Sequence, residues 1–149
     1  MKVKMQGAGR NLPRDMNMGG TLIMCGSSDF RETAQNDMTV VTLCRVKNRF
    51  DGDEHHHFYF KAFVDTVEVW RDAIDNIEQF LRDGKTVLVH CIHGRDRTGG
   101  VVYALLRRDG LTHEEAKQEM YRMRPRRAIE WRKILEDRKD FHEELVKEE

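Results

Sequence analysis

Cysteine is scarce in this 149-residue chain, and its three copies lie far apart. Cys25, Cys44 and Cys91 form no CxxC pair, and their odd number leaves at least one thiol unpaired. The spacing argues against a zinc site built on cysteine pairs and against the disulfide framework of a small secreted domain. We therefore expect thiols at these positions rather than structural bridges.

Long hydrophobic runs and a net charge are also missing. No segment approaches the roughly 18 to 20 apolar residues that a membrane helix needs, and the first 20 residues lack the apolar core of a secretory signal. Lysine plus arginine equals aspartate plus glutamate at 26 each, so no overall field attracts nucleic acid or membrane. We expect a cytoplasmic or nuclear protein with no membrane span and no stable nucleic-acid complex, whose anion affinity comes from local clusters.

Repeats, low-complexity tracts and linkers are absent as well. With 39% hydrophobic residues, the chain is long enough for one core and too short for two comfortable domains. The sequence therefore predicts a single domain over residues 1–149, of which residues 1–19 form an irregular N-terminal segment. It does not indicate an oligomeric state.

Short apolar segments rich in β-branched residues predict the strands. Such segments, bounded by polar or turn residues, are typical of buried strands. We expect four of them, over Thr21–Cys25, Thr39–Cys44, Phe58–Val64 and Thr86–Val89.

Apolar residues at three- and four-residue spacing predict helices that dominate the second half of the chain. In THEE, Thr112 and Glu115 form a capping box, which marks a helix start. The predicted helices cover Val67–Leu81, the segment after Cys91 up to about Arg108, Thr112–Met123 and Ala128–Val146. Strands followed by helices around a strand-loop-helix unit indicate an α/β fold.

The segment VLVHCIHGRDRTGG, residues 87–100, places a cysteine where an apolar strand gives way to a glycine-containing loop and then a helix. Backbone N–H groups and the helix dipole converge at such a position, and they lower the pKa of a cysteine. Gly94 permits the loop to wrap around an anion, and Arg97 offers a fork that fits two phosphate oxygens. Thr98 is placed beside the sulfur, where its hydroxyl can stabilise a departing thiolate.

A purely structural interpretation exists for each of these residues. Free cysteine is most often an inert core residue, an arginine at a helix start usually faces solvent, and a glycine in such a loop often serves only the turn. The combination of all of them favours a phosphate-binding site.

HCIHGRDRTG resembles the HCxxGxxR[ST]G signature of cysteine-dependent protein tyrosine and dual-specificity phosphatases. LIMCGSSD is similar to the first strand and turn of this family, and LTHEEAKQEMYRMRP to its helix that ends in arginine-proline. The resemblance covers roughly Gly20 to Leu135. The signature is matched at His90, Cys91, Gly94, Arg97, Thr98 and Gly99.

The resemblance implies a compact, atypical dual-specificity phosphatase fold. This is an α/β fold with a central, largely parallel sheet of four to five strands flanked by helices. The implied reaction is attack of the Cys91 thiolate on a phosphate ester, followed by hydrolysis of the cysteinyl-phosphate, with His90 in a supporting role and no metal or other cofactor. The resemblance assigns phosphate binding to Ile92, His93, Gly94, Arg95, Asp96 and Arg97.

The reaction needs a general acid for the leaving group. The family places an aspartate after the strand that precedes the long helix, and Asp65 occupies that position, 26 residues before Cys91. Two alternatives stay open. Asp65 is suited to cap the helix that begins near Val67, and Asp96 stands next to Arg97, as in lipid-directed relatives with a CxxGxDRT loop.

The substrate is less defined than the reaction. The resemblance favours a phosphorylated protein, with phosphotyrosine, phosphoserine or phosphothreonine as the target. His93 and Arg95 add cationic groups that suit a substrate with more than one phosphate. The HCxHGxxRTG pattern also resembles RNA 5′-triphosphatases, and its CxxGxDRTG variant resembles phosphoinositide phosphatases. A phosphoinositide, an inositol polyphosphate and an RNA 5′-triphosphate are therefore the alternatives. The RNA interpretation lacks an aromatic platform. Arginines at one helix end form either a basic rim or a solvated face: Arg122, Arg124, Arg126 and Arg127.

Two functions of another kind are also considered. An inactive, phosphate-binding interaction module is possible in this family, although Cys91 and Arg97 are both intact. Sulfur transferases of the rhodanese type and arsenate reductases also use a cysteine loop at a helix start, but the HCxxGxxRTG spacing fits them poorly.

Cys44 closes the predicted strand Thr39–Cys44. In phosphoinositide phosphatases of the tumour-suppressor type, a cysteine at the corresponding strand end forms a disulfide with the nucleophile. The resemblance thus implies a reversible Cys44–Cys91 bridge that protects the thiolate from further oxidation, and a small buried side chain is the alternative.

Three consecutive histidines, His55 to His57, suggest a metal site at first sight. Adjacent residues cannot all face one ion, so we expect instead an acidic surface loop before a strand, and no metal ligands.

Overall fold

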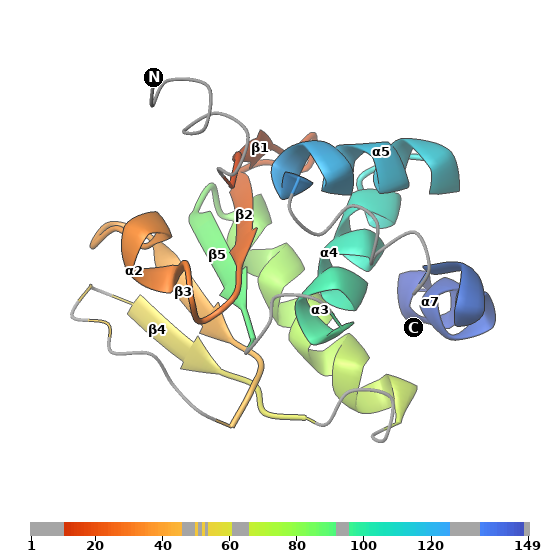
Figure 1. The fold of residues 1–149 in the computed structure, drawn as a ribbon, viewed down its shortest axis with the longest axis horizontal. Helices are drawn as coiled ribbons and strands as arrows, with labels where there is room; N and C mark the ends of the chain where they lie inside the picture. The colour runs from red at the N-terminus through yellow and green to blue at the C-terminus, as the bar shows by residue number, and fades with distance from the viewer. Residues whose placement is uncertain are drawn as a thin grey trace.

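The computed structural model describes residues 11–45, 50, 52, 54–60, 66–91, 96–125 and 135–147. Its centre is a five-stranded sheet with helices on both faces (Figure 1). The strands are β1 (Arg14–Asp15), β2 (Thr21–Cys25), β3 (Thr39–Thr42), β4 (Glu54–His57) and β5 (Thr86–His90). The helices are α2 (Phe30–Thr33), α3 (Val67–Arg82), α4 (Asp96–Arg108), α5 (His113–Met123) and α7 (Lys139–Val146).

The strand order β1-β2-β5-β3-β4 places β5 at the centre of the sheet. The pairs β2–β5, β5–β3 and β3–β4 are parallel, and only the short β1 runs antiparallel to its neighbour. His90 at the end of β5 is level with Cys25 of β2 and Thr42 of β3. The carboxyl ends of the parallel strands therefore meet at one edge of the sheet, where open α/β sheets bind their ligands. The α/β fold with a largely parallel sheet is confirmed.

Two hydrophobic cores cover the two faces of the sheet. In the larger one, α3 and α4 pack against one face, α5 and α7 pack on α4, and Trp70, Tyr103 and Met120 are fully buried. The smaller one lies under α2 on the other face, with Phe30 against Ile23 and Val40. Because both faces are covered, the central strands consist of continuous apolar runs rather than alternating ones.

Most elements lie where local sequence signals predict them. β2 matches its prediction residue for residue, and α3 extends only one residue beyond Leu81. The capping box is present: the Glu115 amide donates to Thr112 Oγ1 at 3.2 Å, and the Thr112 amide donates to Glu115 Oε1 at 2.9 Å. Gly110, with a φ of +104°, ends the helix α4 in a conformation that glycine adopts readily.

The third strand was predicted in the wrong place. It covers Glu54–His57, inside the segment expected to be an acidic loop, while Phe58–Phe60 form no strand and residues 61–64 lie outside the described ranges. β4 pairs in parallel with β3 at the edge of the sheet. An edge strand tolerates polar side chains, so its sequence lacks the apolar run by which the buried strands were found.

Two further differences concern the ends of the chain. Arg14–Asp15 form β1, although residues 1–19 were predicted to be irregular. The last helix is not continuous to Val146: Arg138, with φ −125° and ψ 41°, separates the helical turn at Leu135–Asp137 from α7. The start of that predicted helix, residues 128–134, lies outside the described ranges, as does Trp131. No helix among the described residues has the length and apolar character to span a bilayer.

Candidate active site

Cys91 follows the last residue of the central strand, and the helix α4 begins five positions later at Asp96. The side chain is buried, with 2% of its surface exposed. The predicted strand and helix on either side of the loop are thus confirmed. Ile92, His93, Gly94 and Arg95 lie outside the described residues, and the side chain of Asp96 is not described.

Arg97 lies in the first turn of α4 and is partly buried. Its Nη1 donates a hydrogen bond to the Phe60 carbonyl oxygen at 3.0 Å. This bond ties the start of α4 to the segment after β4 and restricts the guanidinium, so Arg97 is not a freely solvated side chain at a helix start.

Thr98 is completely buried in the same turn of α4. Its Oγ1 has no hydrogen-bond partner within the part of the chain that the structure describes. Buried hydroxyl groups nearly always have a partner, so a hydroxyl without one at this position is unusual.

His90 is fully buried at the end of β5, and its ring centroid lies 4.6 Å from that of Phe30. Its Nε2 lies 2.7 Å from Thr42 Oγ1. Burial, together with the nearby His55, lowers the pKa of His90 to about 4, although the Cys91 backbone acts in the opposite direction. The imidazole next to Cys91 is therefore neutral at pH 7.

Asp65, the predicted general acid, lies outside the described residues. The helix α3 begins at Val67, as predicted, and the side chain of Thr66 at its N-cap position makes no capping hydrogen bond to the described residues. The two roles considered for Asp65, general acid and helix cap, therefore both stay predictions.

All three cysteines are buried. Cys44 and Cys91 belong to the same hydrophobic core, and the Cys44 carbonyl is bonded to the His57 ring. Cys25 lies under α2, where burial and the charge of Asp29 raise the pKa of its thiol, and where Cys91 also influences it. The Cys44–Cys91 bridge remains a prediction.

A buried ion pair near the site was missed by the sequence analysis. Arg124 Nη2 lies 3.1 Å from both carboxylate oxygens of Asp29, and both side chains are almost fully buried. Burial alone would raise the pKa of Asp29, but the hydrogen bond from Asn11 and the charge of Arg124 hold it below its usual value. Arg124 is thus neither a basic rim nor a solvated residue.

The other arginines of that helix end do not supply a rim within the described residues. Arg122 is bonded to Glu119 and to the Pro13 carbonyl, and Arg126 and Arg127 lie outside the described ranges. The position of Arg124 before a proline was the only signal for its burial, and its partner stands 95 positions away.

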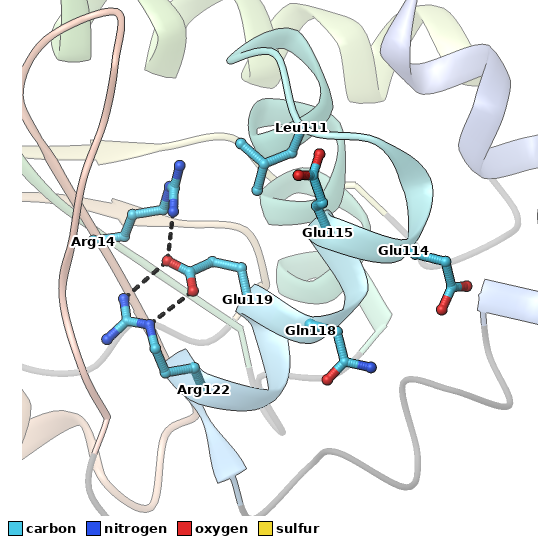
Figure 2. Close-up of a pocket in the computed structure, with 7 residues that line it drawn as sticks. All are labelled: Arg14, Leu111, Glu114, Glu115, Gln118, Glu119 and Arg122. Carbon is cyan, nitrogen blue, oxygen red and sulfur yellow. Dashed lines mark hydrogen bonds and ion pairs between the residues drawn. The ribbon is translucent and has the colours of Figure 1, made fainter.

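A groove of about 610 Å³ lies between β1 and α5 (Figure 2). Glu119 pairs with both of its arginines, with contacts of 2.6 Å to Arg14 Nη1 and 2.7 Å to Arg122 Nε, and Glu114 and Glu115 add two further negative charges to the lining. The groove is at the far end of the sheet from Cys91, because β1 pairs with the first residues of β2 whereas Cys25, the last one, pairs with His90. Its uncompensated charge is negative, so this groove is unsuited to a phosphate ester.

The histidine strand shows no metal geometry. Among the described residues, no group of three or more histidine, cysteine, aspartate or glutamate side chains is arranged to hold an ion. His56 instead contacts Glu54 at 2.6 Å on one face of β4, and His55 contacts Thr42 at 2.7 Å on the other.

Similarity to known structures supports the arrangement. Tk-PTP, in a crystal structure of its active form, is 29% identical, with a TM-score of 0.56 over 81% of this chain and 95% of that one. A mouse putative dual specificity phosphatase is 19% identical, with a TM-score of 0.60 over 87% and 91%. The core catalytic domain of the PP-IP phosphatase SIW14 from S. cerevisiae is 12% identical, with a TM-score of 0.55 over 77% and 76%. The last two similarities show the fold alone.

The sequence itself was compared with families and with individual proteins. No curated protein matches it. The model of the tyrosine phosphatase family, in contrast, matches residues 16–145, which include every strand after β1 and the whole loop after Cys91. The chain therefore belongs to the tyrosine phosphatase family, and it is a phosphatase of the superfamily that comprises protein tyrosine and dual-specificity phosphatases.

Proposed function

We propose that this chain is a dual-specificity protein phosphatase that hydrolyses phosphate esters through a cysteinyl-phosphate on Cys91. One observation carries the proposal: Cys91 follows the central strand at the carboxyl edge of the sheet and precedes a helix whose first turn holds a restrained Arg97. A sulfur in that position faces the positive end of a helix dipole.

In the first step, the Cys91 thiolate attacks the phosphorus. An S–P bond forms, the P–O bond to the substrate breaks, and the leaving oxygen takes a proton from a general acid. Asp65 is our choice for this acid, and Asp96 is its competitor. Arg97 binds two phosphate oxygens with its guanidinium, as the negative charge in the transition state requires.

In the second step, water attacks the phosphorus and gives a proton to the carboxylate that donated one in the first step, the S–P bond breaks, and Cys91 leaves as a thiolate. The buried Thr98 hydroxyl is suited to donate a hydrogen bond to that thiolate, which explains why a buried hydroxyl lacks a partner among the described residues. His90 supports the sulfur from the preceding position as a neutral ring.

Phosphotyrosine, phosphoserine and phosphothreonine in proteins are the proposed substrates. The match to the tyrosine phosphatase family supports this class. A small molecule with several phosphates is the second candidate. His93 and Arg95 add cationic groups to the loop, and Asp96 matches the aspartate of the CxxGxDRT pattern. 5′-Triphosphorylated RNA completes the set to be tested.

The test is phosphate release by the wild type and Cys91→Ser in the presence of a metal chelator. The substrates are phosphotyrosine and phosphothreonine peptides, phosphoinositides, inositol polyphosphates and 5′-triphosphorylated RNA. We expect turnover of the peptides that survives chelation and is lost in Cys91→Ser. A preference for inositol polyphosphates would replace the proposed substrate, and phosphate binding without any turnover would favour the inactive binding module.

A further inference from the structure

Three histidines lie on one face of the sheet near the end of the central strand, and the proposed mechanism uses only one of them. His55 and His57 belong to the edge strand β4, and His90 ends the central strand. Between these strands, Thr42 Oγ1 lies 2.7 Å from His55 Nε2 and 2.7 Å from His90 Nε2. One hydroxyl thus connects the edge of the sheet to the residue that precedes Cys91. We refer to these three groups as the His55–Thr42–His90 chain.

The surroundings of this chain are mostly apolar. Thr42 and His90 are fully buried and His55 is partly buried. The Phe30 ring lies 4.6 Å from that of His90, and the Phe50 ring 5.9 Å from that of His55. Water therefore has little access to the hydroxyl.

Four titratable or charged groups face the same side of the sheet. His57 lies two residues from His55 and is bonded to the Cys44 carbonyl, and Cys25 of β2 is level with His90. The Asp29 carboxylate acts on His90 and is itself paired with Arg124. Glu54 and His56 point to the opposite face, where they bond to each other.

The Thr42 hydroxyl can donate only one proton, and this limits the directions in which the hydrogen bonds of the His55–Thr42–His90 chain can run. If the hydroxyl donates to one imidazole nitrogen, the other imidazole has to donate to it. A protonated His55 carries a proton on Nε2, so it donates to Thr42. Thr42 then donates to His90 Nε2, and the proton of the neutral His90 ring resides on Nδ1.

The second ring nitrogen of His90 is the one that matters for the nucleophile. Nδ1 is buried and has no close hydrogen-bond partner among the described residues. The Cys91 backbone nevertheless acts on this ring. A proton on Nδ1 is thus available to the backbone at the start of the catalytic loop.

We propose that Thr42 and His55 are positioning residues for the catalytic loop: His55, acting through Thr42, determines which nitrogen of His90 carries the proton, and so which hydrogen bond the ring offers to the backbone at Cys91. The inference rests on the proposed function in one respect, since an effect on turnover requires Cys91 to be the nucleophile. The hydrogen-bond chain itself does not depend on turnover.

The first test follows the histidine rings by nitrogen-15 NMR between about pH 5 and 8, where an unperturbed histidine titrates. We expect His90 to stay neutral while its proton shifts to Nδ1 at the midpoint at which His55 is protonated. Thr42→Val keeps the shape of the side chain and should abolish this coupling, whereas Thr42→Ser should retain it. If His90 does not respond to His55 in the wild type, the inference is wrong.

The second test is the pH profile of kcat/KM for the best substrate. Loss of one hydrogen bond is expected to lower kcat/KM about tenfold in Thr42→Val and in His55→Gln and to remove the inflection at the His55 midpoint. His56→Gln, on the opposite face of the same strand, is the matched control and should keep the profile. Superimposable profiles for wild type and His55→Gln would overturn the positioning role.

The two failures are distinguishable. A coupled His55 and His90 titration in a wild type without turnover supports the chain and overturns only the proposed function. Turnover in a wild type in which protonation of His55 does not move the His90 proton supports the proposed function and overturns the positioning role.

Discussion

His90 shows how a single buried side chain makes the stability of the fold depend on pH. Its imidazole is uncharged in the folded state because burial, with His55 nearby, lowers its pKa from 6.5 to about 4. In the unfolded chain the same group binds a proton below about pH 6.5. The unfolded state thus gains protons first as the pH falls, so acid destabilises the fold.

We therefore expect the contribution of His90 to the unfolding free energy to be fully present above pH 6.5 and to fall as the pH drops toward 4. The full shift corresponds to about 3 kcal/mol of unfolding free energy. Urea unfolding of the wild type and His90→Asn at several pH values measures it: the variant should lose the slope in this window. An equal slope in both proteins would mean that another group is responsible.

The Asp29–Arg124 pair gives a second prediction at the residue scale. Asp29→Asn leaves a fully buried guanidinium without its counter-charge, which is expected to lower the unfolding free energy by about 3 to 5 kcal/mol. Because the pKa of Asp29 is lowered, its contribution is present above about pH 3.8 and is lost as the pH falls further. Chemical denaturation at pH 7 provides the measurement.

Asp37→Asn is a matched control, since Asp37 is an exposed residue in the same part of the chain. It should change stability by less than about 0.5 kcal/mol. A similarly small effect for Asp29→Asn would show that the pair contributes nothing net. The pair was not predictable from the sequence, because 95 positions separate the two residues and no local sequence pattern indicates that they are in contact.

At the scale of elements, sequence patterns locate what local interactions determine. α5 was predicted with its boundaries because the capping box lies within four consecutive residues. β4 was misplaced because its conformation depends on pairing with β3, and its EHHH sequence has no strand pattern of its own. The interruption of the last helix at Arg138 was likewise not predicted, because no glycine or proline marks it in the sequence.

At the start of β4, the pKa of Glu54 is expected to depend on Lys85, the residue before β5. Lys85 Nζ lies 2.8 and 2.9 Å from the two Glu54 oxygens, and this hydrogen bond, with that from His56, lowers the pKa of Glu54 to about 2. Lys85→Met should raise the Glu54 pKa toward 4.5, as carbon-13 NMR of the carboxyl group would show.

The stability effect of Lys85→Met should be modest, at most about 1 kcal/mol at pH 7, because the pair is partly exposed. A lowered carboxyl pKa contributes above about pH 4.5 and ceases to contribute as the pH falls toward 2, so the difference from the wild type should vanish there. Lys147→Met, which breaks a more exposed pair with Glu144, should leave the Glu54 pKa unchanged. An unchanged Glu54 pKa in Lys85→Met would contradict this account.

On the scale of the whole molecule, the fold brings the carboxyl ends of four parallel strands to the place where α4 begins. The α/β class and the candidate nucleophile were predictable from one ten-residue signature and the strand and helix patterns around it. The contacts of His90 with Thr42, and of Thr42 with His55, were not predictable, because sheet order determines them and β3 and β5 are separated by more than 40 residues.

The redox prediction for the molecule concerns Cys44. After peroxide treatment, peptide mapping should find a Cys44–Cys91 disulfide that dithiothreitol reverses, and Cys44→Ser should accumulate irreversible sulfinic acid at Cys91. Cys25→Ser is the control, because Cys25 lies in the other core. Sulfinic acid at Cys91 in the wild type with Cys44 still reduced would refute the bridge.

In the proposed mechanism, the rate of the second chemical step should depend on the Thr98 hydroxyl more than the rate of the first. Removal of its hydroxyl in Thr98→Ala should slow hydrolysis of the intermediate more than its formation, since only the second step expels the thiolate. Rapid-mixing kinetics should therefore show a larger burst of released alcohol and a slower steady state than in the wild type. Equal bursts in both proteins would place Thr98 outside the second step.

The most direct measurement for the central claim is to trap the intermediate. Acid quenching of Thr98→Ala during turnover of a phosphorus-32-labelled phosphotyrosine peptide, followed by peptide mapping, locates the covalent phosphate. The mechanism predicts covalent label on the peptide that contains Cys91, and none in a Cys91→Ser variant of the same protein. Steady turnover with no label on that peptide, or label on another residue, would contradict the assignment of Cys91 as the nucleophile.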